Sequence, residues 1–142
     1  MTKLPELDVL HCCNHVLCVS KPAGMPTVPD SSRDESLLER AKRWVAAEFN
    51  KPGAVYLGVV HRLDRPVSGV LAFARTSKAA ARLTAAFHDR VARKTYVAIT
   101  STPLNVREGT VEHWVVKKGS KNVVRVVPEA TPGARFARTR YR

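Results

Sequence analysis

Two short apolar runs with a tight loop between them constrain the fold of this chain more than any other feature. Residues 54–60 (AVYLGVV) are rich in β-branched side chains and residues 70–74 (VLAFA) are apolar throughout, so both are predicted to be strands. Between them, Pro66 fixes its own φ angle and Gly69 allows a sharp turn into the second strand. The sequence therefore predicts a rigid loop over residues 61–69.

This loop carries a single carboxylate, Asp64, flanked by Arg62 and Arg65. Nearby positive charge favours the charged form of an acid, which is the form that a carboxylate nucleophile needs. For an arbitrary Asp between two arginines, a plain salt bridge is the commoner explanation. The charge pattern alone leaves both interpretations open.

A longer pattern around Asp64 favours the catalytic interpretation. His61-Arg62-Leu63-Asp64, followed by Ser68-Gly69, resembles the signature of the RluA-type pseudouridine synthases. Three further stretches resemble motifs of that family and follow in the family's order: residues 19–24 (VSKPAG), 74–80 (ARTSKAA) and 93–98 (RKTYVA). The resemblance covers most of the chain from about Leu10 onward.

Two departures from the family pattern are visible. Val67 stands where the family usually has Thr, and the family's later arginine-rich motif is not among these 142 residues. The resemblance therefore implies that residues 1–142 form the N-terminal portion of a pseudouridine synthase catalytic domain. No separate N-terminal RNA-binding domain is expected, because too few residues precede Val9.

The resemblance implies an isomerase that converts specific uridines in structured ribosomal or transfer RNA to pseudouridine. Uracil is detached from C1′ of the ribose and rejoined through C5. Because this needs neither a redox partner nor a group donor, no cofactor is expected. Asp64 is implied to be the essential carboxylate, since carboxylates form covalent intermediates with sugar carbons. Attack at C1′, attack at ring C6 and abstraction of a sugar proton all stay open.

The residues next to Asp64 are implied to contact the substrate. A target uridine must be flipped out of its stack, and Arg62 is expected to fill the space that it leaves. An ion pair of Arg62 with Asp64 or with a phosphate is the alternative. Arg65 is the second cation at the site, and His61 is expected to fix the loop by hydrogen bonds.

Tyr96 is the second catalytic candidate, and it rests on the match of Lys94-x-Tyr96 to the family's tyrosine motif. Its ring can stack on uracil and its phenol can remove the C5 proton, while Lys94 is expected to bind substrate. A tyrosine in a strand is more often a core residue, so that alternative is kept.

The positive charge is concentrated in the second half of the chain. Residues 1–74 hold nine Lys and Arg against eight Asp and Glu, a net charge of +1, whereas residues 75–142 hold fifteen against four, a net charge of +11. Such an excess indicates a polyanion partner, here RNA. A non-enzymatic RNA-binding protein, such as a basic ribosomal component, also explains this charge, but it gives no reason for Asp64 to lie between two arginines beside Pro66. A truncated or degenerate synthase that binds RNA without turnover is the other alternative.

Periodicity predicts the remaining elements. Strands are expected at Val9–Cys13 and Val16–Ser20, followed by a Pro- and Gly-containing stretch, Lys21–Pro26, that shapes the floor beneath the Asp64 loop. The Lys21 side chain could also contact an RNA phosphate, but a conformational role of this stretch is the preferred interpretation. A capping box of Ser36 and Glu39 starts a helix that ends by Asn50 and places Trp44 in the core.

A second helix is expected from a cap at Ser77 to about Ala92, with an apolar stripe that ends at Val91. The rest is predicted to be strands: 95–100, a hairpin of 109–117 and 122–127 connected by 118–121, and an exposed strand over 135–142 if a later segment of the polypeptide pairs with it. The predicted fold class is α+β, with a mixed, mostly antiparallel sheet and flanking helices.

Cys12, Cys13 and Cys18 lie near His11 and His15 but lack metal-ligand spacing, so they are expected to be apolar fillers and no metal site is predicted. There is no apolar run of about 18 residues that could span a membrane. The N-terminus contains acidic residues and no long apolar core, so no signal peptide is expected. Cytoplasmic residence is the resulting default, and a monomer is expected.

Overall fold

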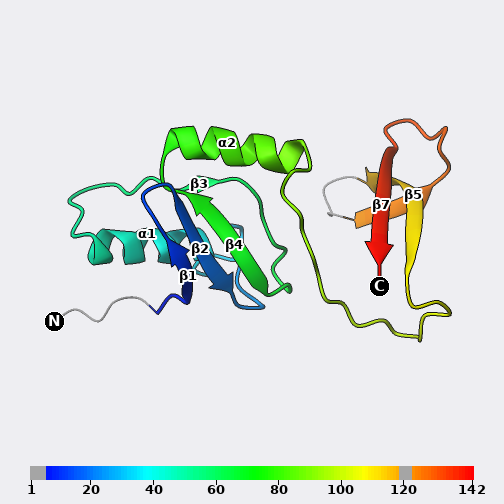
Figure 1. Cartoon of the computed structure of the whole chain (residues 1–142), viewed down its shortest axis with the longest axis horizontal. Helices are drawn as coiled ribbons and strands as arrows, with labels where there is room; N and C mark the ends of the chain where they lie inside the picture. Colours follow the sequence, from blue (N-terminus) through cyan, green and yellow to red (C-terminus); the bar gives the residue numbers. More distant parts are fainter. Residues whose placement is uncertain (1–5, 119–122) are drawn as a thin grey trace. The chain divides into compact units, whose positions relative to one another are not determined.

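The computed structural model describes residues 6–118 and 123–142. The chain divides after Thr95 into two units, residues 1–95 and residues 96–142, which are described separately (Figure 1). No helix in the described part of the chain is long and apolar enough to cross a membrane.

A four-stranded sheet with the strand order β1-β2-β4-β3 forms the frame of the first unit. Its strands are β1 (Val9–Cys12), β2 (Val16–Lys21), β3 (Gly58–Val59) and β4 (Gly69–Ala74). β2 and β4 pair antiparallel, from Val16 opposite Ala74 to Lys21 opposite Gly69. The predicted loop therefore ends where β4 begins.

Helix α1 (Leu37–Glu48) packs on one face of this sheet. The buried core joins three positions of the helix to alternate positions of two strands: Leu37, Ala41, Val45, Leu17, Val19, Leu71 and Phe73. The capping box is present, since Ser36 Oγ accepts from the N–H of Glu39 at 3.2 Å and the Ser36 N–H donates to the Glu39 carboxylate at 2.9 Å. Trp44 is partly buried against the core, as predicted.

Helix α2 (Ser77–His88) lies against the opposite face of the sheet at Gly58, where a side chain would lie 3.0 Å from the Cβ of Ala80. Its N-cap is Thr76, whose Oγ1 accepts from the N–H of Ala79 at 3.1 Å, so the prediction of Ser77 was wrong by one residue. The predicted end at about Ala92 was also wrong.

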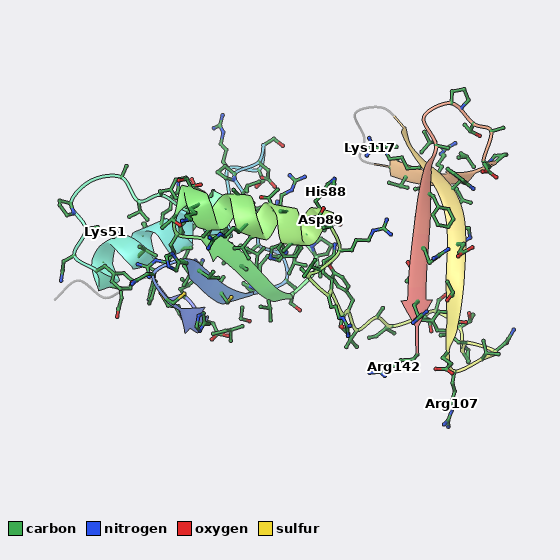
Figure 2. The ribbon with its side chains drawn as sticks, turned by 45° about the horizontal axis from the view of Figure 1, so that its top comes forward. Lys51, His88, Asp89, Arg107, Lys117 and Arg142 are labelled. Carbon is green, nitrogen blue, oxygen red and sulfur yellow. The ribbon has the colours of Figure 1, made fainter. Side chains whose placement is uncertain are left out.

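The early end of α2 has a local cause. Arg90 has φ 59°, in the left-handed region that cannot continue a right-handed helix. Val91 lies beyond this break and is 74% exposed, so it does not belong to the apolar stripe of the helix. His88 and Asp89, at the end of α2, are labelled in Figure 2.

The second unit is a three-stranded antiparallel sheet with the order β6-β5-β7. Its strands are β5 (Gly109–Lys118), β6 (Val123–Val127) and β7 (Arg135–Tyr141). The antiparallel pairing of β5 with β6 confirms the predicted strand pair, but residues 119–122 of its connection lie outside the described residues. The exposed strand near the C-terminus is confirmed as β7, but its partner is β5 and not a later segment, as the prediction had required.

Two predicted strands differ from the structure. Of residues 54–60 only Gly58–Val59 pair as a strand, and residues 95–100 form none. Val97 and Ile99 are 99% and 100% exposed, because no neighbouring strand pairs with this segment among the described residues. A strand needs partners for its backbone N–H and C=O groups, which composition alone does not supply.

The predicted α+β class is confirmed. The five strand pairs of the described residues are all antiparallel, and they form two sheets where one was expected.

Candidate active site

Asp64 lies on the loop between β3 and β4, with its side chain exposed to solvent. The carbonyl of Asp64 accepts a hydrogen bond from the N–H of Val67 at 3.0 Å, which closes a turn over Arg65 and Pro66. Within residues 6–118 and 123–142, no Lys, Arg or His nitrogen lies within ion-pair distance of the Asp64 carboxylate. The salt bridge to its sequence neighbours, which was the alternative interpretation, is not formed.

Lys21 anchors this loop from below. Its side chain is fully buried, and Nζ donates to the carbonyl oxygens of Pro22 at 3.0 Å, Met25 at 2.7 Å and Arg65 at 3.2 Å. Burial lowers the pKa of Lys21, and the charge of Arg65 lowers it further, while the charge of Asp64 acts in the opposite direction. The ammonium therefore ties the stretch after β2 to the residue next to Asp64.

The sequence contained a signal for this role of Lys21 that was missed. Side chains alternate between the two faces of a strand, and the inward positions of β2 are Leu17 and Val19, both fully buried. Lys21 is the next residue of the same parity, so the strand pattern places its side chain inside. The suggestion that Lys21 touches an RNA phosphate was wrong, because the side chain is buried and fully engaged.

Thr27 and Gly24 hold the loop on either side of Asp64. Thr27 Oγ1 donates to the carbonyl of Leu63 at 2.7 Å and accepts from its N–H at 3.3 Å, and both residues are buried. The N–H of Gly24 donates to the carbonyl of Arg65 at 2.8 Å. Residues 21–27 thus form the floor beneath the loop, as the sequence predicted.

The guanidinium of Arg65 is directed to groups that precede α1. It forms an ion pair with Asp34, lies 3.8 Å from a carboxylate oxygen of Asp30, and donates from Nε to the carbonyl of Gly24 at 2.9 Å. These contacts hold the Asp64 loop against the segment that precedes α1. Its predicted contact with substrate stays a prediction.

His61 fixes the loop in the way that the sequence suggested. The last residue of β3, Val59, pairs with Phe73 of β4. Beyond it, Nε2 of His61 accepts a hydrogen bond at 2.9 Å from the N–H of Ala72, the residue before Phe73. The imidazole stacks on Phe87 of α2 with ring centroids 4.5 Å apart. Burial lowers the pKa of His61, with a smaller contribution from the charge of Lys94. A neutral imidazole that accepts at Nε2 carries its proton on Nδ1.

The remaining predicted site residues are exposed. Arg62 has no ion-pair partner in the described part of the chain, and Lys94 is exposed but close enough to lower the pKa of His61. Tyr96 is the first residue of the second unit, 59% exposed, in the segment that forms no strand. Its catalytic role stays a prediction.

Cys12, Cys13 and Cys18 lie in or next to β1 and β2. Among the described residues, no three His, Cys, Asp or Glu side chains are grouped as ligands, and Cys12, Cys13 and Cys18 are free thiols. Cys13 is exposed, and its pKa is lowered to about 7. The largest cause is a hydrogen bond from the backbone of His15 in the β1–β2 turn, followed by a hydrogen bond from the His11 side chain. Cys13 is therefore not the buried apolar filler that the sequence suggested.

Residues 15–142 match the family model described as RNA pseudouridylate synthase. The chain belongs to this family. This confirms the resemblance to RluA-type synthases that was drawn from the motif around Asp64.

Curated relatives agree with this assignment. The chain is 30% identical over 138 residues to the uncharacterized RNA pseudouridine synthase YhcT of Bacillus subtilis, covering 96% of this chain and 44% of that protein. It is 29% identical to ribosomal large subunit pseudouridine synthase C of Vibrio cholerae, covering 100% of this chain and 42% of that protein. The chain thus spans less than half of the length of these relatives.

A solved structure shares the fold. Human RNA pseudouridylate synthase domain containing 4 superposes with a TM-score of 0.77 at 21% identity, covering 94% of this chain and 52% of that one. This likeness supports the α+β architecture of a synthase domain.

Proposed function

We propose that this synthase-family chain carries the catalytic carboxylate of an RNA pseudouridine synthase, and that Asp64 is that carboxylate. The observation that carries the proposal is an exposed acid, without an ion-pair partner among the described residues, on a loop held on both sides by hydrogen bonds from the buried residues Lys21 and Thr27. A catalytic group needs this combination of a free side chain and a fixed backbone.

The proposed reaction is an isomerisation. The bond between N1 of uracil and C1′ of ribose breaks, a bond from C5 to C1′ forms, the C5 proton is lost, and a proton is gained at N1. The carboxylate of Asp64 acts on the sugar or the ring as nucleophile or base. No external oxidant, reductant or group donor enters this balance.

Arg62 and Tyr96 are proposed to assist from exposed positions. Arg62 lies two residues before Asp64 and is free to reach a phosphate or the gap left by a flipped uridine. Tyr96 is proposed to stack on uracil and to remove the C5 proton, a role that rests on its place in the Lys94-x-Tyr96 motif.

The proposed substrate is ribosomal or transfer RNA. The net charge of +12 suits a polyanion, and the relatives' names include ribosomal large subunit pseudouridine synthase C and, in Haemophilus ducreyi, tRNA pseudouridine synthase C. Binding without turnover is the second candidate, because the excess of positive charge suits RNA whether or not a uridine is modified.

The test is release of tritium from C5-labelled uridine in ribosomal and transfer RNA. Asp64→Asn should lower the rate at least about a thousandfold while leaving the fold and RNA binding intact, as removal of a reacting group does. Glu48→Gln, at an exposed acid on α1, is the matched control and should keep the full rate. Tyr96→Phe should stop proton release if the phenol is the base, whereas a ring that only stacks tolerates Phe.

Turnover by Asp64→Asn at even about a hundredth of the wild-type rate would reject Asp64 as the essential carboxylate. RNA binding by the wild-type chain with no tritium release on either RNA would favour the binding protein.

A further inference from the structure

The sheet of the second unit places an aromatic pair among arginines on one of its faces. In an antiparallel pair, residues directly opposite each other share a face, and alternate residues of a strand do so too. Trp114 of β5 lies opposite Phe136 of β7. The same parity adds Arg138 and Arg140 of β7 and, through its pairing with Val116, Arg125 of β6. We name this surface, Trp114, Phe136, Arg125, Arg138 and Arg140, the aromatic face.

The two rings are in contact, with Trp114 half-buried and Phe136 exposed. Their centroids are 5.5 Å apart with an interplanar angle of 58°, and Phe136 is 47% exposed. The guanidinium of Arg138 lies 5.4 Å from the centre of the Phe136 ring. Arg125, Arg138 and Arg140 are all exposed. An aromatic surface surrounded by exposed arginines matches the requirements of a base-stacking site, since every base offers a π-face and Arg binds phosphate.

We propose that the aromatic face binds a single-stranded segment of the RNA substrate, with bases stacked on Trp114 and Phe136 and phosphates bound by the arginines. The inference rests on the proposed function only in taking RNA as the substrate. Single-strand binding folds use this combination of stacking rings and a cationic surface.

Charge complementarity favours RNA as the occupant. Residues 96–142 hold nine Lys and Arg against three Glu, a net charge of +6. Arg107 and Arg142 lie at one end of the sheet and Lys117 near the other, as Figure 2 shows. Glu112, which pairs with Arg138 across the strands on the same side of the sheet, accepts from Arg138 at 2.6 Å in an exposed ion pair. Such pairs are weak, so a phosphate can replace the carboxylate.

A structural role for the same rings is the main alternative. A cross-strand aromatic pair contributes to sheet stability whether or not it binds a ligand. Protein could also cover the face, either a second copy of the chain or a further segment of the polypeptide. These alternatives predict different results from the experiment that follows.

The first measurement uses the fluorescence of Trp114 in the full chain. The chain has two tryptophans, so Trp44→Phe leaves Trp114 as the only one. Its emission should be quenched by acrylamide in the free protein and by a uridine oligonucleotide of about ten residues, a length within the known range of single-strand sites. If Trp44→Phe does not fold, Trp114→Phe in the otherwise unchanged chain should remove the quenching by the oligonucleotide.

The second measurement compares variants on the two faces. Phe136→Leu should weaken binding of the oligonucleotide about 5- to 150-fold, the range expected for one stacked base at ~1–3 kcal/mol. Arg140→Gln lies on the aromatic face, whereas Arg135→Gln, on the same strand, lies on the opposite face because Arg135 pairs with Val115. Both variants lose one exposed charge, and Arg140→Gln should weaken binding more.

Three results would overturn the inference. Trp114 emission that acrylamide cannot reach in the free chain would mean that protein covers the face. Equal binding by Phe136→Leu and wild type would leave the rings a structural role. Equal losses for Arg140→Gln and Arg135→Gln would indicate diffuse attraction without a site.

Tritium release measured on the same preparations separates this inference from the proposed function. Turnover without quenching rejects the aromatic face alone. Quenching without turnover in the wild-type chain rejects the proposed isomerase and supports the face. Absence of both quenching and turnover rejects both proposals.

Discussion

Replacing the buried Lys21 by methionine should destabilise the first unit by about 2–4 kcal/mol. Methionine keeps an unbranched apolar stem but removes the ammonium that donates to the carbonyls of Pro22, Met25 and Arg65. The carbonyl of Arg65 keeps a second donor, the N–H of Gly24 at 2.8 Å. The carbonyls of Pro22 and Met25 have no other protein donor within the described residues.

The magnitude follows from two opposing contributions. A fully buried carbonyl left without a donor costs about 1–3 kcal/mol, and the bonds to Pro22 and Met25 are partly buried, so the loss for the two is at most roughly 2–6 kcal/mol. Part of this is offset because the variant no longer buries a charge, and the lowered pKa of Lys21 shows that its charge is disfavoured by burial. The net loss therefore falls toward the lower half of that range.

The assay is unfolding in urea followed by circular dichroism, with Lys51→Met as the matched control. Lys51 is exposed in the segment after α1 (Figure 2), so its substitution should change the free energy of unfolding by less than about 0.5 kcal/mol. Since Lys21 also ties down the residue next to Asp64, the folded fraction of Lys21→Met should lose at least about tenfold in isomerisation rate. Equal stability of the two variants would refute the anchoring role of Lys21.

Three further predictions test local features of the first unit. Because the pKa of His61 is lowered from its usual value of 6.5, the unfolded chain binds the proton more readily, so stability should be lost as pH falls below about 6.5. His61→Asn should reduce this loss, and His88→Gln, at an exposed histidine, should not; equal pH dependence in all three proteins would contradict it. Thr76→Ala should cost about 1 kcal/mol of stability and Ser77→Ala less than about 0.5 kcal/mol, and the reverse order would reject Thr76 as the cap. Cys13, with a pKa of about 7, should be alkylated by iodoacetamide at a rate that is half-maximal near pH 7, and an unchanged rate in Cys13→Ser would show that another thiol reacts.

Local signals in the sequence were sufficient where the structure depends on local contacts. The capping box and helical spacing predict α1 because Ser36 and Glu39 bond to each other within one turn. Residues 95–100 have strand composition but no strand, because pairing depends on a partner that the composition does not specify. The β5–β6 pairing was predictable because its two strands are close in sequence.

In the candidate site, too, the features that depend on local sequence were predictable and the contacts between distant residues were not. The motif at residues 61–64 identified the Asp64 loop, and the stretch after β2 was correctly placed beneath it. The partners of Arg65, Asp30 and Asp34, lie more than thirty residues earlier in the chain, so no local pattern connected them to it. Lys21 was predictable in principle from the parity of β2, although a lysine at an inward position is unusual enough to be overlooked.

The contacts that fix the Asp64 loop are made largely by its backbone, and this bears on the departure at Val67. Leu63 is held through its N–H and C=O, Arg65 through its C=O, and Val67 through its N–H to the carbonyl of Asp64 at 3.0 Å. Any residue except proline supplies that N–H. The side chain of Val67 is partly buried against the core, where an apolar group is well suited. The presence of valine where the family usually has threonine therefore leaves the turn intact and does not argue against a catalytic role for Asp64.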